Sequence, residues 1–259
     1  MLKELTSVKN PTVQAAKNLQ TAKGRREMNA FLCDGEHMTG EALQVCPEKV
    51  RSLFVDASME ERFSDIVAKA LPGTDVYRVS RAVMETISQV KTPQGIAAVC
   101  TLPESVPLEK QGNRLVLLEN VQDPGNVGTI LRTLDAAGFD GCILTEGCAD
   151  PWSPKTLRAT MGSAFRVPVT FVKDGTAACV ALKELGYSVI GAELHGQPFY
   201  QRAVLPEKLC LLIGNEGQGL TDGALAACDY RFKLPMMGGA ESLNAAIAAA
   251  VMMYDIVNR

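Results

Sequence analysis

Short apolar runs alternate with helix-like patterns in the first hundred residues. Apolar runs at 50–56, 75–80 and 95–100 are separated by stretches at 59–71 and 81–90 whose apolar residues recur every three or four positions. A short apolar run bounded by polar residues favours a strand, and a spacing near 3.6 residues favours a helix. The alternation of the two predicts an α/β fold for this part of the chain.

The same alternation restarts after residue 113. The expected helices lie at about 127–137, 155–163, 176–185 and 241–257. Between them lie strands that are apolar almost throughout, at 114–121, 141–145, 167–172, 187–194, 209–214 and 231–236. Strands of this kind are buried on both faces. We therefore expect a mostly parallel sheet that is covered by helices on both sides.

Residues 101–113, TLPESVPLEKQGN, separate the two patterned regions. This stretch places two prolines and a glycine among polar residues without periodicity, which is typical of a linker. The chain has 259 residues, and an average domain has about 100 to 200. We therefore predict a front domain at 1–100, a linker at 101–113 and a second domain at 114–259.

The composition narrows the class of protein. Hydrophobic residues make up 47% of the chain, enough for a sizeable core. No run of about 20 uncharged apolar residues suits a membrane span, and the first residues lack the apolar run of a signal peptide. The eight cysteines include no C-x-x-C pair, and the two histidines are isolated. We expect a soluble cytoplasmic protein without a bound metal.

Positive charge is concentrated near the start of the chain. The whole chain carries a net charge of −3, but residues 1–30 contain six basic and two acidic residues, a local charge of +4. A basic arm of this kind could contact the phosphates of a nucleic acid. A solvated helix face would account for the same pattern. The candidate contacts are Lys17, Lys23, Arg25 and Arg26.

The first of three motifs in the second domain is ENVQDPGNVGTILRTLDAAG at 119–138. It joins a buried strand to a helix that we expect to start near Asn126, which could cap that helix or bind a ligand. At 100° per residue, Val127, Ile130 and Leu131 share one face, whereas Arg132 lies about opposite. An ordinary surface arginine would fit this position. In open α/β sheets, however, ligands bind at the carboxyl ends of strands, where a guanidinium suits a phosphate or ribose oxygen.

The second motif, LCLLIGNEGQGL at 209–220, is a strand that leads into a glycine-rich loop. Gly214, Gly217 and Gly219 allow a tight turn and a close approach to a ligand. The order G-x-x-G-x-G is neither the dinucleotide fingerprint nor a phosphate-binding P-loop. A simple glycine-rich turn would explain the glycines. It would not explain why Asn215 and Glu216 directly follow a buried strand.

The third motif, LPMMGGAESLNAAIAAAVMMYD at 234–255, combines a strand end, a diglycine loop and a helix start. Ser242 and Asn244 lie where that helix is expected to begin, and Ser242 could serve as its N-cap. No charged residue occurs from Ser242 to Tyr254. A helix that is apolar on all sides must be buried, either against the sheet or against another subunit.

Together the N-x-G-x-x-x-R of Asn126, Gly128 and Arg132, the IGNEGQGL segment and the LPM…ESLN segment resemble the three motifs of the SpoU family of RNA 2′-O-methyltransferases. Their order and spacing agree with that family over about residues 114–257. The front domain, through NPTVQAAKNL and FLCDGEHMTGEAL, is similar to the L30e-like substrate-binding module found in the same family.

The resemblance implies an α/β protein with a C-terminal trefoil-knotted SPOUT domain and a smaller N-terminal L30e-like domain. It implies S-adenosylmethionine as cofactor and RNA as substrate, with 23S ribosomal RNA favoured over transfer RNA. It also implies a homodimer through the knotted domain. The charge-free last helix supports that dimer independently, because a self-complementary apolar face suits two identical subunits.

The resemblance also assigns the site. It places Arg132, Asn126, Glu216, Ser242 and Asn244 in the catalytic site. It places the cofactor against Leu212, Ile213, Gly214, Asn215, Gly217, Gly219, Leu234, Met236, Leu243, Asn244 and Ala245. A guanidinium does not give up its proton readily and is a poor base, so we interpret Arg132 as a group that stabilises a phosphate or an oxyanion.

Two other classes of protein compete with this interpretation. An RNA-binding protein that has lost catalysis would be expected to lack polar residues from the three motifs, and none is missing. A nucleotide-dependent oxidoreductase would need the fingerprint glycines and an acidic residue about twenty positions on, which the chain lacks. The sequence identifies neither the target nucleotide nor the general base.

Overall fold

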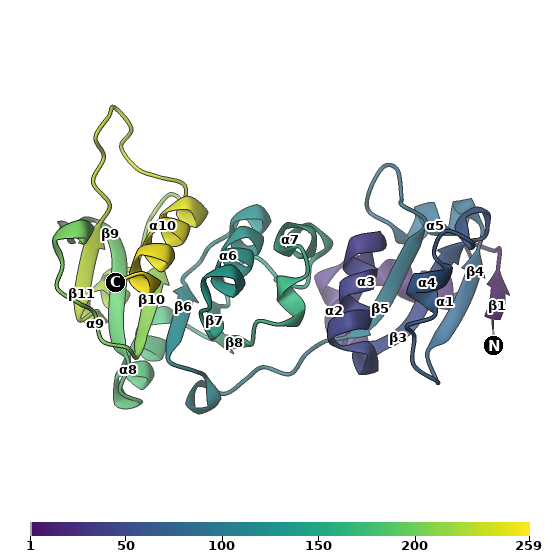
Figure 1. The fold of residues 1–259 in the computed structure, drawn as a ribbon, viewed down its shortest axis with the longest axis horizontal. Coiled ribbons are helices and arrows are strands. Elements are labelled where there is room, and N and C mark those ends of the chain that lie inside the picture. Colours follow the sequence, from purple (N-terminus) through teal and green to yellow (C-terminus); the bar gives the residue numbers. More distant parts are fainter. Residues whose placement is uncertain (1) are drawn as a thin grey trace. The chain divides into compact units, whose positions relative to one another are not determined.

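The computed structural model describes residues 2–259, which form two compact units (Figure 1). The front unit consists of Met1–Glu104 and Asp150–Arg166, and the second unit consists of Ser105–Ala149 and Val167–Arg259. The chain therefore enters the second unit, returns to the front unit for a short segment, and goes back. None of the helices in residues 2–259 is both long and apolar enough to cross a membrane.

The front unit is built on a mixed sheet of five strands in the order β1-β4-β3-β5-β2. β1, β4 and β3 are parallel, and β5 runs antiparallel to both β3 and β2. The strands are β1 (Leu2–Leu5), β2 (Ala30–Asp34), β3 (Val50–Asp56), β4 (Asp75–Val79) and β5 (Ile96–Thr101). The predicted α/β alternation of this region is confirmed.

The helices of the front unit are short. They are α1 (Pro11–Asn18), α2 (Ala22–Met28), α3 (Glu36–Val45), α4 (Ser64–Val67), α5 (Arg81–Ile87) and α7 (Pro154–Thr160). The helix expected at 59–71 is reduced to α4, because the wholly buried Phe63 has a non-helical backbone directly before it. Residues 60–63 and 68–69 of that stretch form turns.

The segment Asp150–Arg166 belongs to the front unit because of its side chains. The ring of Trp152 packs against Phe31 of β2, with 5.1 Å between the ring centroids. Arg166 forms a 2.6 Å ion pair with Glu41 of α3. The sequence predicts a second domain that runs unbroken from residue 114, because the alternation of strands and helices does not reveal contacts between distant segments.

The second unit contains six parallel strands in the order β11-β9-β10-β6-β7-β8. The strands are β6 (Arg114–Leu118), β7 (Gly141–Thr145), β8 (Val169–Val172), β9 (Ser188–Pro198), β10 (Leu209–Ile213) and β11 (Tyr230–Lys233). The helices are α6 (Pro124–Ala137), α8 (Gly175–Glu184), α9 (Asp222–Ala227) and α10 (Ala245–Val257). The predicted parallel sheet is confirmed.

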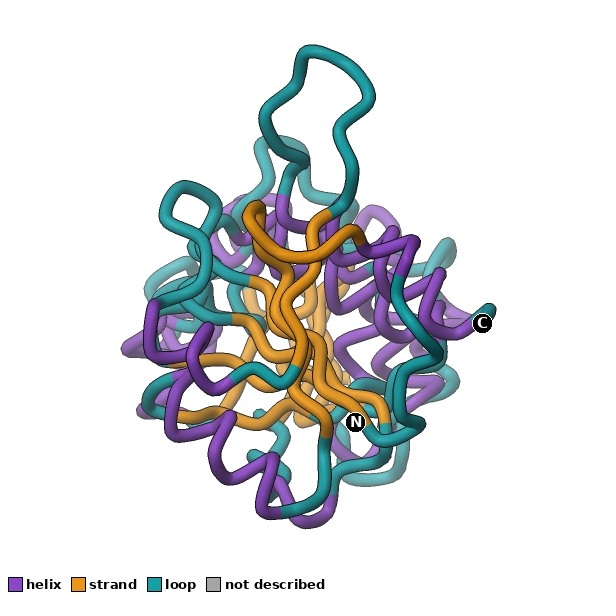
Figure 2. The backbone as a smooth tube through the Cα atoms, turned by 90° about the vertical axis from the view of Figure 1, so that its left-hand side faces the viewer, coloured by secondary structure: helices purple, strands orange, loops and turns teal. Residues whose placement is uncertain are grey.

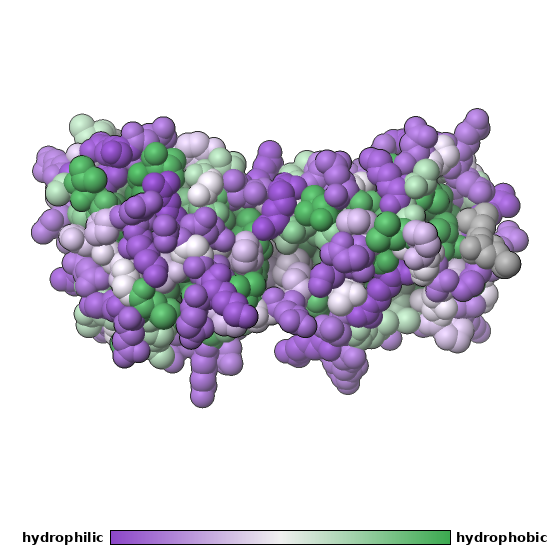
Figure 3. Space-filling view, turned by 60° about the horizontal axis from the view of Figure 1, so that its bottom comes forward, coloured by the Kyte–Doolittle hydropathy of each residue, from purple (hydrophilic) through white to green (hydrophobic). Residues whose placement is uncertain are grey.

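Helices cover both faces of this sheet. Alternate strand residues such as Leu115 and Leu212 pack with Cys179 and Leu182 of α8 in one apolar cluster. The residues between them, such as Val116, point to the other face and are equally buried. α6 and α10 pack against each other. On the surface shown in Figure 3, apolar side chains form small separate groups among polar ones.

Most of the predicted linker packs on the second unit. The Val106 amide donates a 3.1 Å hydrogen bond to the carbonyl of Val169, and the Tyr187 hydroxyl donates one of 2.5 Å to the carbonyl of Gly112. A short 3-10 turn, Leu108–Lys110, lies between these anchors. The boundary between the units therefore falls between Glu104 and Ser105.

Candidate active site

Three loops leave the second unit's sheet at the same edge. β6, β10 and β11 point in the same direction, so the loops that follow them all start at the carboxyl edge. These loops, 119–123, 214–221 and 234–244, carry the polar residues of the three motifs or lead directly into them. The last loop extends well beyond the strand ends in Figures 1 and 2. The carboxyl edge is where open α/β sheets bind ligands.

Glu216 joins the loop after β10 to the start of α6. Its Oε1 accepts hydrogen bonds from Asn126 Nδ2 at 2.8 Å and Asp123 N at 3.1 Å. Its Oε2 accepts one from Gln122 N at 3.2 Å. Burial raises the pKa of Glu216, but hydrogen bonds to its carboxylate outweigh burial and hold the pKa below its ordinary value. Glu216 is therefore an anion at neutral pH that orients the first turn of α6.

Asn126 extends this connection to the third motif. Its Oδ1 accepts a 2.9 Å hydrogen bond from Asn244 Nδ2. The Oδ1 of Asn244 in turn accepts hydrogen bonds from the amides of Ala246 and Ile247 and caps α10. Glu216, Asn126 and Asn244 thus form one hydrogen-bonded chain that joins all three motifs.

The helix starts differ from those expected. α6 begins at Pro124, and Asp123 is its N-cap through a 3.0 Å hydrogen bond from Asn126 N. The expected cap at Asn126 is wrong, because Pro124 suits the first helical position and moves the start upstream. Ser242 does not cap α10 and lies exposed in the preceding loop. Because Asp123 caps α6, the side-chain amide of Asn126 is available to bond to Glu216 and Asn244.

The glycine-rich loop after β10 is folded back on itself. The amides of Asn215 and Gly219 each donate to the carbonyl of the other, at 3.0 and 2.9 Å. A side chain at Gly214 would come within 2.2 Å of the Gly219 backbone, so only glycine fits there. The Asn215 side chain donates a 2.8 Å hydrogen bond to the carbonyl of Asn120 in the loop after β6.

Arg132 lies on the exposed side of α6. It follows Asn126 by six residues, which corresponds to about 9 Å along the helix axis. Within residues 2–259 its side chain forms no hydrogen bond or ion pair. Its guanidinium is therefore available to a ligand, as predicted from the helical wheel.

The loop 234–244 offers main-chain groups to a ligand. Leu243 is 40% exposed, and Met237 is almost wholly exposed. In the described part of the chain, the backbone N–H and C=O groups of residues 236–243 have no hydrogen-bond partner. Unpaired main-chain donors and acceptors in this loop fit the polar edge of an adenine and an amino-acid group. S-adenosylmethionine contains both.

Comparison with known proteins identifies the family. A family model described as "SpoU rRNA Methylase family" matches residues 113–254, and one described as "MRM3-like substrate binding domain" matches residues 10–98. The chain belongs to the SpoU rRNA methylase family. The match to the SpoU model covers the first two motifs and the third as far as Tyr254.

Relatives of known name agree with this assignment. The 23S rRNA (guanosine(2553)-2'-O)-methyltransferase RlmP of Bacillus subtilis is 38% identical over 98% of this chain and 99% of its own length. The AdoMet-bound rRNA methyltransferase of Sinorhizobium meliloti is 31% identical, with a TM-score of 0.86 over 99% of this chain and 98% of its own. AviRb, a SpoU methyltransferase of Streptomyces viridochromogenes, has a TM-score of 0.83 at 27% identity over 96% and 98% of the two chains.

These matches confirm the predicted fold class, the class of enzyme and the cofactor. This member of the SpoU family is an S-adenosylmethionine-dependent RNA methyltransferase with a substrate-binding domain in front. The predictions made for individual residues rest on the geometry described above.

The structure corrects one of the predicted RNA contacts, Arg25. Arg25 is only 4% exposed, and its guanidinium binds Oδ2 of Asp150 and the carbonyl of Leu19. It therefore joins two segments of the front unit and is not available to a phosphate. Lys17, Lys23 and Arg26 are exposed, and Lys23 forms an ion pair with Glu27 at 3.7 Å.

Two residues of the site were missed at the sequence level. Asn120 has a left-handed backbone, with φ of 56°, which turns its carbonyl toward Asn215. Glu119 is buried at the end of β6 and binds the loop after β10. An asparagine directly after a strand is a signal for this turn, because asparagine tolerates the left-handed region. For Glu119, the signal in the sequence is a glutamate at the end of an otherwise apolar strand.

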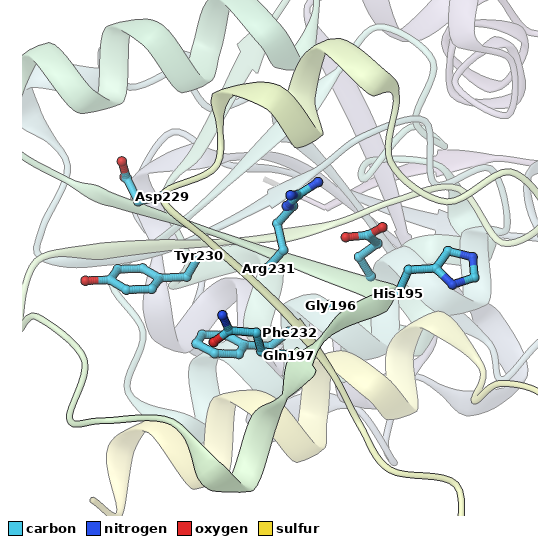
Figure 4. Close-up of a pocket in the computed structure, with 8 residues that line it drawn as sticks. His195, Gly196, Gln197, Asp229, Tyr230, Arg231 and Phe232 are labelled. Atoms are coloured by element: carbon cyan, nitrogen blue, oxygen red, sulfur yellow. The ribbon is translucent and has the colours of Figure 1, made fainter.

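A hollow in the second unit is separate from the hydrogen bonds that join Glu216, Asn126 and Asn244. It measures about 330 Å³ and lies between β9 and β11, where the register shifts between Arg231 and Phe232 (Figure 4). Its lining is mixed: polar residues such as His195 and Gln197 lie beside the aromatic Tyr230 and Phe232. The predicted site is instead a surface formed by the loops that follow β6, β10 and β11.

No group of three metal-ligating side chains occurs in the part of the chain that the structure describes. The cysteines are all free. Burial raises the pKa of Cys179 and Cys46 to about 12, so these thiols stay protonated at neutral pH. They act as small apolar side chains.

Proposed function

We propose that this protein transfers a methyl group from S-adenosylmethionine to a ribose 2′-hydroxyl of 23S ribosomal RNA. The observation that carries this proposal is the hydrogen-bonded chain of Glu216, Asn126 and Asn244, which joins the three SpoU motifs at the carboxyl edge of the sheet. The near full-length similarity to a 23S rRNA 2'-O-methyltransferase supports ribosomal RNA over transfer RNA. With such a substrate, we propose that the protein acts in the cytoplasm.

The cofactor would lie between the loops 214–219 and 234–245. Gly217 and Gly219 are exposed in the first loop and carry no side chain that would keep a ligand away, and residues 236–243 present unpaired main-chain groups in the second. The bound cofactor supplies an electrophilic methyl group. The remaining cofactor contacts that we propose are Leu212, Ile213, Gly214, Asn215, Leu234, Met236, Leu243, Asn244 and Ala245.

Arg132 would act on the RNA. Its guanidinium is a cation that is exposed and unpaired in the described structure. It can therefore hold the phosphate next to the target ribose or stabilise negative charge on the 2′-oxygen as its proton leaves. Asn126 and Glu216 hold the first turn of α6 and so place Arg132. Ser242 and Asn244 would shape the loop before α10.

The front unit would hold the RNA. Residues 10–98 match a substrate-binding domain, and Lys17, Lys23 and Arg26 are exposed on α1 and α2. Contacts from lysine and arginine to phosphates bind RNA without regard to its sequence.

A homodimer through the second unit would cover α10. Ile247 and Tyr254 are 50% and 47% exposed and lie two helical turns apart on one side of that helix. An apolar stripe of this kind suits a two-fold interface. Light scattering of the purified protein tests this: a dimer that Tyr254→Asp converts to monomers supports it, and a wild-type monomer contradicts it.

The substrate is tested by comparing methyl transfer to different RNAs. Purified protein and labelled S-adenosylmethionine are mixed with unmodified 23S ribosomal RNA, 16S ribosomal RNA or transfer RNA. We expect incorporation into 23S RNA alone. Stronger labelling of transfer RNA would contradict the proposed substrate without affecting the family assignment.

A further inference from the structure

We infer that Glu119 is a positioning residue that holds the cofactor loop, defined as residues 214–221, in its binding conformation. The inference rests on the proposed placement of S-adenosylmethionine against that loop. Glu119 lies in the first motif, and its hydrogen-bond partner could not be predicted from the sequence.

Glu119 is buried and directed at the far end of the cofactor loop. Its side chain is 3% exposed. Its Oε2 accepts a 2.8 Å hydrogen bond from the Thr221 amide, and its Oε1 accepts one of 2.9 Å from the Thr221 hydroxyl. Thr221 provides the only hydrogen bonds to this side chain among the residues described. Bonds to a carboxylate are about twice as strong as neutral ones.

Thr221 is the residue at which the loop ends and α9 begins. It is the N-cap of α9, and its hydroxyl accepts a 3.3 Å hydrogen bond from Ala224 N while it donates to Glu119. The carboxylate therefore fixes the point at which the cofactor loop meets its helix.

Two carboxylates hold the same pair of loops in opposite directions. Glu216, from the cofactor loop, binds backbone amides of the loop after β6. Glu119, from the end of β6, binds the backbone amide of the cofactor loop at Thr221. The cofactor loop is thus tied near both ends. Gly217 and Gly219, between the two ties, remain exposed.

Gly175, at the start of α8, leaves room for the Glu119 carboxylate. A methyl group at Gly175 would come within 2.4 Å of Oε1 of Glu119, so an alanine would displace the carboxylate without removing it. Gly175 has no positive φ, so its backbone itself accepts alanine. This offers a second way to disturb the tie, from the opposite side.

The fold alone does not call for a carboxylate here. A buried carboxylate loses its hydration, a cost that an apolar side chain of similar size avoids. Both hydrogen bonds of Glu119 go to the cofactor loop and none to the sheet that surrounds it. The role that matches these contacts is to set the position of that loop.

The test measures S-adenosylmethionine binding by calorimetry, with RNA absent, together with thermal unfolding. The variants are Glu119→Gln, Gly175→Ala, Thr221→Val and Thr221→Ser. We expect Glu119→Gln and Gly175→Ala to weaken binding about tenfold or more, as loss of a bond to a charged group predicts. Thr221→Val should weaken it less, because the backbone amide remains. Thr221→Ser keeps both the backbone amide and the hydroxyl as donors to Glu119, so it should bind with wild-type affinity.

Asp140→Asn is the matched control. Asp140 Oδ2 accepts a 2.8 Å hydrogen bond from Arg114 N at the opposite end of β6. Its replacement makes the same acid-to-amide change and should leave the affinity unchanged. A lower unfolding temperature with unchanged affinity in Glu119→Gln and Gly175→Ala would overturn the inference. If the unaltered protein fails to bind S-adenosylmethionine, the placement of the cofactor fails, and the inference fails with it.

Discussion

Asn126 donates a 2.8 Å hydrogen bond to Glu216, although ninety positions separate the two residues. The carbonyl end of the same amide accepts a hydrogen bond from Asn244. Since one asparagine contacts both other motifs, a change in any of the three side chains is transmitted to the helix that carries Arg132.

Asn244 has two roles that can be separated. Asn244→Asp keeps the acceptor that caps α10 but loses the donor to Asn126. We expect this variant to unfold at nearly the wild-type temperature and to transfer methyl groups at least tenfold more slowly. Asn244→Ala should also lose about 1 kcal/mol of stability, the usual worth of an N-cap. Equal rates in Asn244→Asp and wild type would contradict the role of the Asn126 contact.

Arg132→Ala should separate cofactor binding from catalysis. Arg132 is exposed and has no partner in the described structure, so its removal leaves the fold intact. We expect unchanged affinity for S-adenosylmethionine and a loss of about 10²-fold or more in transfer, as for other lost transition-state contacts. Calorimetry and single-turnover assays measure the two quantities. A parallel loss of cofactor affinity would mean that Arg132 has a different role.

Glu216 should contribute to stability in a pH-dependent way. Its pKa in the folded protein lies below its ordinary value, so its contribution is complete above that ordinary value. The contribution is lost as the pH falls through the folded pKa. The difference in unfolding free energy between wild type and Glu216→Gln should therefore be larger near pH 7 than near pH 3. Denaturant titrations at both pH values measure it, and a difference that grows in acid would contradict the prediction.

Arg25 and Arg26 are adjacent but should behave differently. Arg25→Ala leaves Asp150 without its buried partner and should cost about 3 kcal/mol of stability. Arg26→Ala should leave stability unchanged and weaken RNA binding, with a shallower dependence on salt. Thermal unfolding and RNA binding at two salt concentrations distinguish them. Weaker RNA binding by a fully folded Arg25→Ala protein, with Arg26→Ala unaffected, would reverse these roles.

Much of the fold follows from local pattern. The strands of the second unit are predictable because burial on both faces makes them apolar throughout, as in Leu115–Leu118. The exposed position of Arg132 follows from helical periodicity alone. What pattern cannot give is the partner of a side chain. Arg25 looks like a surface residue until Asp150, 125 positions away, is placed beside it.

For the site too, the sequence predicts most of the residues, and the structure adds their contacts. Asn126, Glu216 and Asn244 were expected from motif resemblance, and the structure adds the bonds between them. The start of α6 was misplaced because Pro124 and Asp123 together form a better start than Asn126. Glu119 was missed because a buried carboxylate is recognised by its contacts, which only the folded chain shows.

The position of the new methyl group tests the central claim most directly. RNA labelled by the purified protein is digested with alkali, which cannot cleave the phosphodiester bond next to a 2′-O-methyl ribose. The account predicts that the label remains in one alkali-resistant dinucleotide, and that Arg132→Ala gives little of it. Label on a base in a single alkali-released nucleotide would contradict ribose methylation.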